Sequence, residues 1–289
     1  MSLLVTLASV VVLVGGVLAI RPLLLRLSQA DARRRGAGPI PDRWLSLLNS
    51  DVPVSHHLQP SERVQLLRAA RELITTRRWE GCRGVVLTED MKVVIAAEAC
   101  LLTMAIPGEP FPGLREILIY PTTFVPRHIG DPRKWLTASE PQRALPELGE
   151  SWSNGIIVLS LEETARGNAN PSDGSNVILH EFAHELAFEH SLTPPSTAAL
   201  AFGRAWDPQV SDPDRWRKVI QLAYDRICAK VDTQTPSVLH PYAATNIDEF
   251  FAVATETFFE RSVELRQEDP ELYELLCTFY RQNPADANS

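Results

Sequence analysis

The sequence of 289 residues is poor in cysteine, with four, and in methionine, with three. Its cysteines (Cys82, Cys100, Cys228 and Cys277) lie far apart and form no CxxC pair. This spacing argues against a disulfide scaffold or a cysteine zinc site, and we expect buried thiols in a reducing compartment. A basic surplus is also lacking. The formal net charge of −8 argues against a nucleic-acid partner, because coating nucleic acid requires a basic face.

No internal repeat is visible, and the 14 glycines and 22 prolines follow no period. This absence excludes collagen-like and repeat architectures. Hydrophobic residues make up 45% of the chain and charged residues 22%, which is ordinary for a globular protein and excludes wholesale disorder. The length suits one domain of ordinary size or two small ones.

Charged side chains are absent from residues 1–20, which are almost wholly apolar from Leu3 onwards. About 20 helical residues match the hydrocarbon thickness of a bilayer, so we predict an uncleaved transmembrane anchor over residues 1–22. The alternative is export after cleavage of a signal peptide, which the small-residue pattern at Val17 and Ala19 favours. The anchor is preferred because no basic residue precedes the apolar run and Arg21 follows it at once.

All five arginines of residues 1–40 follow the apolar run, and only Asp31 opposes them. The positive-inside rule therefore predicts a single-pass membrane protein with its body in the cytoplasm. Residues 23–42 are interpreted as a basic linker rich in proline and glycine, in which the Arg33–Arg35 cluster contacts anionic headgroups. Residues 43–289 remain as the folded domain.

Within that domain, hydrophobic periodicity and helix-start signals predict more helices than strands. The predicted helices cover residues 61–74, 88–104, 176–189, 214–231, 248–260 and 270–280, and the predicted strands cover residues 116–120 and 155–161. Few strands among many helices indicate an α+β domain with a small sheet.

Residues 180–184 read His-Glu-Phe-Ala-His, an HExxH motif. On a helix, His180 and His184 lie on one face about one turn apart, so both imidazoles can reach one metal ion. Glu181 then lies beside the metal, where it can take a proton from water. Ser175 or Asn176 can cap such a helix. The alternative is a helix with two incidental surface histidines.

Two histidines leave a metal site incomplete, so a third protein ligand is needed. His190 has the spacing of the metzincin pattern HExxHxxGxxH, but Ala187 occupies the position where that pattern requires glycine. All three methionines precede the motif, so a Met-turn downstream is also missing. We therefore interpret His190 as an ordinary side chain near the helix C-terminus.

A later helix offers Glu249 and Glu256, two turns apart on one face. Glu249 also forms an N-x-x-E capping box with Asn246, so spacing alone leaves a ligand and a capping residue equally open. Glu256 is either a solvated carboxylate or the acceptor for the Nδ1–H of a ligating histidine. The strand at 155–161 is either a buried central strand or an edge that accepts an extended peptide.

Taken in order, these motifs resemble the Mlc titration factor A (MtfA-like) family of zinc peptidases. The resemblance is carried by Gly149-Glu-Ser-Trp152, by Asn176-Val-Ile-Leu-His180-Glu-Phe-Ala-His184 and by Tyr242-Ala-Ala … Glu249-Phe-Phe-Ala … Glu256. It covers roughly residues 60–280 and leaves out the N-terminal segment. One departure follows the HExxH motif, where family members often have Lys and then Leu-Asp and this chain has Glu185-Leu186-Ala187.

The resemblance implies a zincin-like metallopeptidase domain that binds one Zn²⁺ per chain through His180, His184 and Glu249. It implies Glu181 as the general base and Tyr242 as a second catalytic residue, whose phenol would stabilise the oxyanion. Considered alone, Tyr242 could also be a core tyrosine that caps a loop.

The implied function is zinc-dependent hydrolysis of peptide bonds in a peptide or protein substrate. The anchor predicted over residues 1–22 would tether this activity to the membrane. The resemblance leans towards short peptides with free N-termini, which is aminopeptidase action. The alternative is a non-catalytic regulatory binding protein on the same fold, because the family is associated with sequestering a transcriptional repressor called Mlc. A protein regulator is therefore an expected partner beside the substrate.

Overall fold

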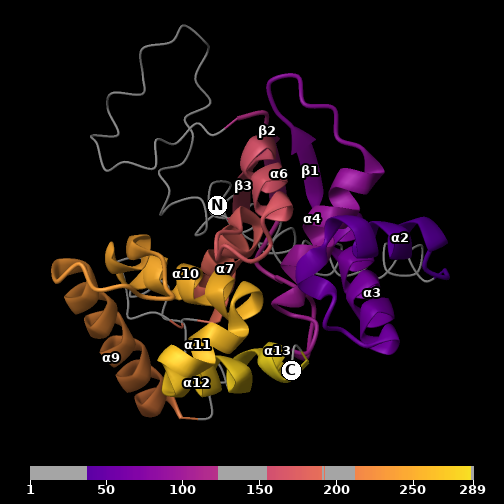
Figure 1. Ribbon diagram of the computed structural model, residues 1–289. Coiled ribbons are helices and arrows are strands. Elements are labelled where there is room, and N and C mark those ends of the chain that lie inside the picture. The colour runs from indigo at the N-terminus through magenta and orange to yellow at the C-terminus, as the bar shows by residue number, and fades with distance from the viewer. Residues whose placement is uncertain (1–37, 123–154, 191, 193–211, 288–289) are drawn as a thin grey trace, which may run out of the picture. The chain divides into compact units, whose positions relative to one another are not determined.

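The computed structural model describes residues 38–122, 155–190, 192 and 212–287 (Figure 1). Contacts divide the chain into two compact units, Met1–Pro39 and Ile40–Ser289, and the elements below belong to the second. Its longer elements are α2 (Asp42–Asp51), α3 (Pro60–Thr76), β1 (Arg78–Gly81), α4 (Glu89–Leu101), β2 (Glu116–Tyr120), β3 (Ile156–Ser160), α6 (Leu161–Ala169), α7 (Val177–His190), α9 (Pro213–Asp232), α10 (Ile247–Glu260), α11 (Ser262–Glu268), α12 (Pro270–Tyr280) and α13 (Pro284–Ala287). Short 3-10 helices cover Pro53–Ser55 (η1) and Pro241–Ala244 (η3).

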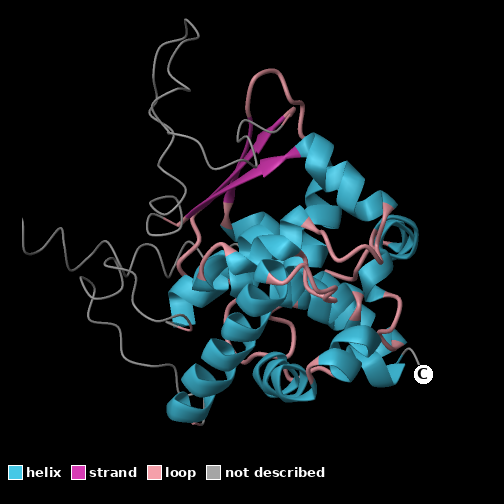
Figure 2. Ribbon diagram, turned by 60° about the vertical axis from the view of Figure 1, so that its left-hand side comes forward, coloured by secondary structure: helices cyan, strands magenta, loops and turns pink. Residues whose placement is uncertain are grey.

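The three strands form a parallel sheet in the order β1-β2-β3, which lies at one edge of the helical part (Figure 2). Alternate residues of β2 are buried, with Ile117 and Ile119 fully covered, and Ile117 pairs with the buried Ile157 of β3. Such alternation is the pattern of a strand with one face on the core. The prediction of a mixed fold with a small sheet is confirmed.

Side-chain caps explain why several helices begin where the sequence predicts. The hydroxyl of Thr88 accepts a hydrogen bond from the backbone N–H of Met91 and starts α4. The carboxylate of Asp212 does the same for Arg215 at the start of α9. Each cap satisfies an amide that the helix itself leaves without a partner.

The helix α7 occupies the centre of this unit, since it contacts α4, α6, α10 and β3. Its apolar side buries Ile178, Phe182 and Leu186 completely, and α10 adds the buried rings of Phe250 and Phe258. Burying a side chain of this size stabilises a fold by about 1.5–3 kcal/mol. The helices α7 and α10 also contact each other directly, which positions the polar residues that lie between them.

The expectation of a single-pass membrane protein is wrong, because no helix among the described residues is long and apolar enough to cross a bilayer. At 20 residues α9 has the length, but it carries charges such as Arg217 and Lys218. The apolar α7 has only 14 residues, fewer than the about 20 that a bilayer requires. Residues 1–22, on which both the anchor and the signal peptide were predicted, lie outside the described residues, as does the linker up to residue 37.

Candidate metal centre

The two histidines of the HExxH motif are positioned by the way α7 begins. The side-chain Oδ1 of Asn176 accepts hydrogen bonds from the backbone N–H groups of Ile178 and Leu179, at 3.0 and 3.1 Å. This confirms one of the two predicted caps and fixes the first helical turn. His180 and His184 then follow one turn apart, with 4.8 Å between their ring centroids.

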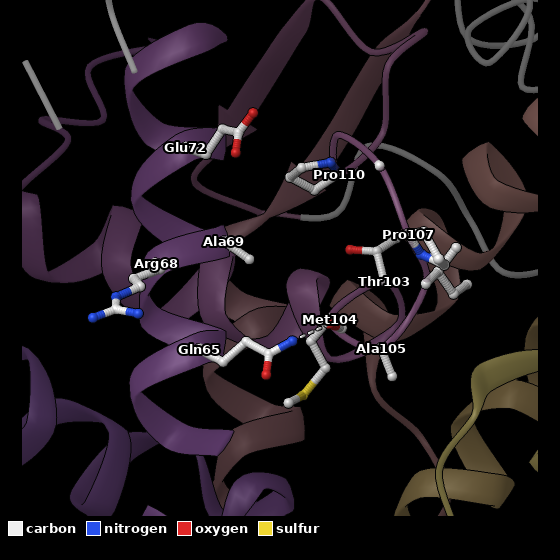
Figure 3. A pocket seen from close by; sticks show the side chains of 11 residues that line it. Gln65, Arg68, Ala69, Glu72, Thr103, Met104, Ala105, Pro107 and Pro110 are labelled. Carbon is white, nitrogen blue, oxygen red and sulfur yellow. Dashed lines mark hydrogen bonds between the residues drawn. The ribbon is translucent and has the colours of Figure 1, made fainter. Parts of the chain in front are cut away.

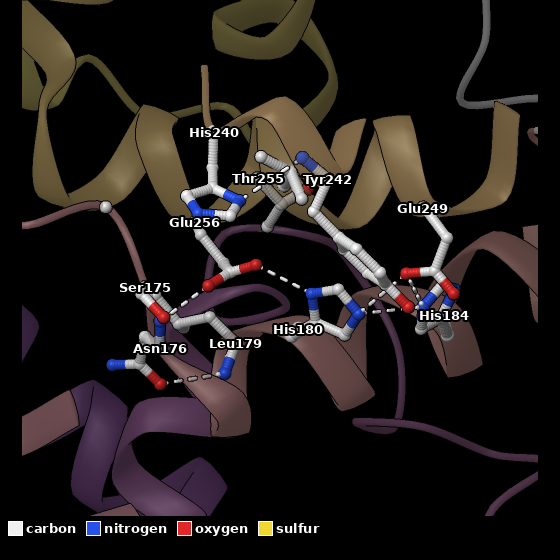
Figure 4. Close-up of polar contacts among 12 residues, drawn as sticks. Ser175, Asn176, Leu179, His180, His184, His240, Tyr242, Glu249, Thr255 and Glu256 are labelled. Carbon is white, nitrogen blue, oxygen red and sulfur yellow. Dashed lines mark hydrogen bonds and ion pairs between the residues drawn. The ribbon is translucent and has the colours of Figure 1, made fainter. Parts of the chain in front are cut away.

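The third side chain, Glu249, comes from the first turn of α10 (Figure 4). Its Oε2 lies 3.0 Å from Nε2 of His180 and 3.5 Å from Nε2 of His184, and these two nitrogens are 3.2 Å apart. One ligand atom from each of the three residues lies within 4.8 Å of the others, so the group could hold a metal ion. We call His180, His184 and Glu249 the metal group.

The donor chemistry of the metal group fits a cation such as zinc. Two imidazole nitrogens and a carboxylate oxygen are a common ligand set of catalytic zinc, and they leave a fourth position open. His184 is buried, and the side chains of His180 and Glu249 are each 15% exposed. A cation bound between these atoms would take the place of the proton and accept an electron pair from each imidazole and from the carboxylate.

Opposite charges decide the protonation of the metal group in spite of its burial. Burial disfavours a charge on His180, but the carboxylates of Glu256 and Glu249 raise its pKa well above the ordinary value. Burial likewise opposes ionisation of Glu249, yet hydrogen bonds with His180 and His184 lower its pKa well below the usual range. Glu249 is therefore an ionised carboxylate, as a metal ligand must be.

A second carboxylate of α10, that of Glu256, contacts the other ring nitrogen of His180. Its Oε1 lies 2.6 Å from Nδ1 of His180, and its Oε2 accepts the backbone N–H of Asn176 at 2.5 Å. Of the two alternatives for Glu256, the structure shows the contact with a histidine of the motif and not a solvated carboxylate, since Glu256 is 5% exposed. A carboxylate at Nδ1 holds the proton there and turns Nε2 towards Glu249 and His184.

The two residues expected to act in catalysis lie beside the metal group. Glu181 is half-buried on α7, and its charge adds to those that raise the pKa of His180. Tyr242 lies on η3, with its ring centroid 6.1 Å from that of His180 (Figure 4). It is 37% exposed, so the alternative of a core tyrosine is wrong.

The capping-box alternative for Glu249 is only half present. Asn246 caps α10 by accepting hydrogen bonds from the backbone N–H groups of Asp248 and Glu249, both at 2.9 Å. The carboxylate of Glu249, however, faces the two histidines of the metal group. The cap at Asn246 therefore fixes the backbone of Glu249, while the carboxylate of Glu249 contacts the two histidines.

Two further residues near the motif, His190 and Glu185, were considered from the sequence. His190 is the last residue of α7, and its side chain lies outside the described part of the chain. Glu185, where the chain departs from the expected family pattern, is fully buried. A Cβ on Gly113 would lie 3.3 Å from its Oε1, so Glu185 lies against the turn before β2.

Sequence reasoning missed Glu98, which contacts the cap of α7. Its Oε2 accepts a hydrogen bond from Nδ2 of Asn176 at 2.9 Å, and the residue is fully buried. Burial raises its pKa to about 8. A signal was present, because Glu98 is the one charged residue between Val93 and Leu102 in the sequence.

A separate hollow of about 390 Å³ lies between α3 and residues 103–110 (Figure 3). Arg68, Glu72 and Thr103 are among the side chains that line it, and no residue of the metal group does. The hollow is therefore distinct from the metal centre.

Comparisons with known proteins match nearly the whole chain. The model of a family described as glucose-regulated metallo-peptidase M90 matches residues 27–281, which include every residue of the metal group. An uncharacterized protein of Synechocystis sp. is 34% identical over 247 residues, which cover 85% of this chain and 86% of that protein. The Mlc titration factor A of Yersinia enterocolitica is 29% identical over 244 residues, covering 84% and 86%.

Proposed function

The chain belongs to the family of glucose-regulated M90 metallopeptidases, and on this premise we propose that it is a zinc-dependent peptidase. Membership also confirms the resemblance to Mlc titration factor A that the motifs indicate. The observation that carries the proposal is the convergence of His180, His184 and Glu249 between α7 and α10. We assign the activity to a zincin-like domain over residues 43–289 that binds one zinc ion per chain.

Zinc bound by the metal group would act as a Lewis acid that polarises the peptide carbonyl and favours ionisation of a water molecule. Glu181, the neighbour of His180, takes the proton from the attacking water and passes it to the leaving amine. The phenol of Tyr242 donates a hydrogen bond to the oxyanion, and one such donor is worth about 3 kcal/mol. Glu256 holds the Nδ1–H of His180 throughout the reaction.

A second candidate is a regulatory role through protein binding. The name of the Yersinia relatives, Mlc titration factor A, indicates for them a role towards a protein factor called Mlc. A protein that only binds has no need of a base and a phenol beside three metal-ligating side chains. The joint presence of Glu181, Tyr242 and the metal group therefore favours the peptidase.

The proposal is tested by assaying peptide hydrolysis with the wild type and the Glu181→Gln variant of the full chain. Aminoacyl p-nitroanilides and N-acetylated counterparts serve as substrates, because only an aminopeptidase requires the free N-terminus. We expect Glu181→Gln to keep its zinc and to lose a factor of about 10²–10⁴ in turnover, the usual contribution of a general base. Full activity in this variant would contradict the assignment.

Inactivity of the zinc-loaded wild type on every substrate would instead favour the binding role. In that case the same protein is tested for association with a purified repressor protein, with and without zinc. Association that persists in Glu181→Gln and without zinc would establish binding as independent of the catalytic residues.

A further inference from the structure

Three helices meet at Asn176, which lies directly before α7 and is 3% exposed (Figure 4). Its side chain caps α7, its Nδ2 donates to Glu98 on α4, and its backbone N–H donates to Glu256 on α10. Its backbone oxygen accepts the N–H of His180 at 2.9 Å. One buried residue therefore connects the helix of the histidines to the helix of Glu249.

The side-chain amide of Asn176 accepts hydrogen bonds through Oδ1 and donates one through Nδ2, which limits what could replace it. The cap needs an acceptor, which Ser, Thr and Asp also provide. The bond to Glu98 needs a donor that reaches α4 at the same time, and a serine hydroxyl engaged in capping is too short for this. An asparagine amide supplies an acceptor and two donors on one planar group.

A continuous series of hydrogen bonds leads from α4 to the metal group. Glu98 accepts from Asn176 at 2.9 Å, Asn176 donates to Oε2 of Glu256 at 2.5 Å, and Oε1 of Glu256 lies 2.6 Å from Nδ1 of His180. Glu98 is fully buried, Asn176 nearly so and Glu256 is 5% exposed. Buried bonds of this kind hold their partners firmly because water does not compete for them.

We propose that Glu98 and Asn176 are positioning residues of the metal centre, which fix the first turn of α7 against α10 so that His180 meets Glu249. This inference rests on the proposed function, since it concerns how the metal group binds zinc. Glu98 acts through its hydrogen bond with Asn176, and neither residue is assigned a contact with the metal or the substrate. Metal sites tolerate ligand displacements of only about 0.5 Å, so a loosened helix start weakens binding.

The test compares zinc affinity, by competition with a chelator, for the full-length wild type, three single variants and one double variant. Glu98→Leu removes the acceptor and places an apolar side chain of similar size in an apolar run of α4. Glu98→Gln removes the group that can ionise but keeps an acceptor for Asn176, so it is the matched control. Asn176→Ser keeps a cap for α7 and loses the donor towards Glu98.

We expect Glu98→Leu and Asn176→Ser each to raise the zinc dissociation constant by about 10–100-fold, the usual effect of losing a residue that orients a ligand. Glu98→Gln stays within about threefold of the wild type. The double variant Glu98→Leu with Asn176→Ser is no weaker than either single one, because both remove the same bond. Cobalt in place of zinc should give a changed visible absorption spectrum in Glu98→Leu and an unchanged one in Glu98→Gln.

A general loss of stability is separated from positioning by thermal unfolding of the metal-free proteins. The metal-free Glu98→Leu protein stays folded at the assay temperature while its zinc affinity falls, and if it does not fold, Asn176→Ser with its cap carries the same test. Wild-type affinity and cobalt spectrum in the folded variants would overturn the inference and leave the proposed function intact. A wild type without zinc affinity would overturn the proposed function, and the inference with it.

Discussion

Two regions near α7 and α10 hold buried or half-buried carboxyl groups that differ in their protonation. In the metal group, Glu249 faces two imidazoles, which lower its pKa well below the usual range against the effect of burial. Near the start of α7, Glu98 faces an amide and Glu260 faces a backbone N–H group, and burial raises their pKa values to about 8 and about 7. We call Glu98 and Glu260 the cap-end carboxyls.

The comparison shows that burial alone does not decide the charge of a carboxyl group. A carboxylate stays ionised inside a protein where cationic or hydrogen-bonding partners compensate for lost hydration. The metal group is therefore prepared for a cation, whereas the cap-end carboxyls are predominantly neutral at pH 6 and serve as hydrogen-bond partners. The two regions are connected through Asn176 and Glu256.

The largest effect is expected on the pH dependence of the free energy of unfolding, which depends on the protonation of Glu98. The folded-state pKa of Glu98 is raised above the ordinary value of 4.5, so its contribution is fully present below pH 4.5 and is lost as the pH rises to about 8. Relative to Glu98→Gln, the free energy of unfolding of the wild type should fall by on the order of 4 kcal/mol across this range. Urea unfolding of both proteins at several pH values measures the difference, and parallel curves would contradict the account.

A smaller effect is expected from Tyr242→Phe, which changes the metal-group side alone. Removing the phenol hydroxyl takes one donor from the oxyanion and should lower kcat about 100-fold. Zinc affinity and the free energy of unfolding should stay at wild-type values, because Tyr242 is exposed and is not a member of the metal group. Steady-state kinetics on a peptide substrate measures kcat, and an unchanged kcat would contradict a role of Tyr242 in the mechanism.

The smallest effect is expected at the N-terminal cap of α4, the helix that carries Glu98. Thr88→Ala removes the hydrogen bond from Met91 at the start of α4 and should cost about 1 kcal/mol of unfolding free energy. Zinc affinity should not change, unlike in Asn176→Ser. A loss of zinc affinity in Thr88→Ala would mean that any destabilisation of α4 weakens zinc binding. That result would contradict the specific role assigned to Asn176.

Local patterns explain what could be predicted from the sequence. The helix of the HExxH motif, the strand at Glu116–Tyr120 and the start of α4 at Thr88 all agree with the structure, because cap residues and hydrophobic periodicity specify them locally. The helix α2 was missed, since it buries only Trp44 and Leu48. The strand β1 was missed because its four residues are too few to show a period.

The pairings across the site could not be derived from spacing. His180 and Glu249 are 69 positions apart, and Glu249 follows Asn246 in a pattern equally typical of a capping box. Only the packing of α7 on α10 brings the carboxylate to the histidines. Glu98 is a further case, because its partner Asn176 lies 78 positions away.

The central claim is that His180, His184 and Glu249 together bind one zinc ion. The most direct test is the zinc content of the purified full chain, measured by elemental analysis beside its Glu249→Ala variant. The account predicts about one zinc per wild-type chain and a clear loss in the variant. Full zinc in both proteins would contradict the role of Glu249, and no zinc in folded wild type supplied with the metal would contradict the site itself.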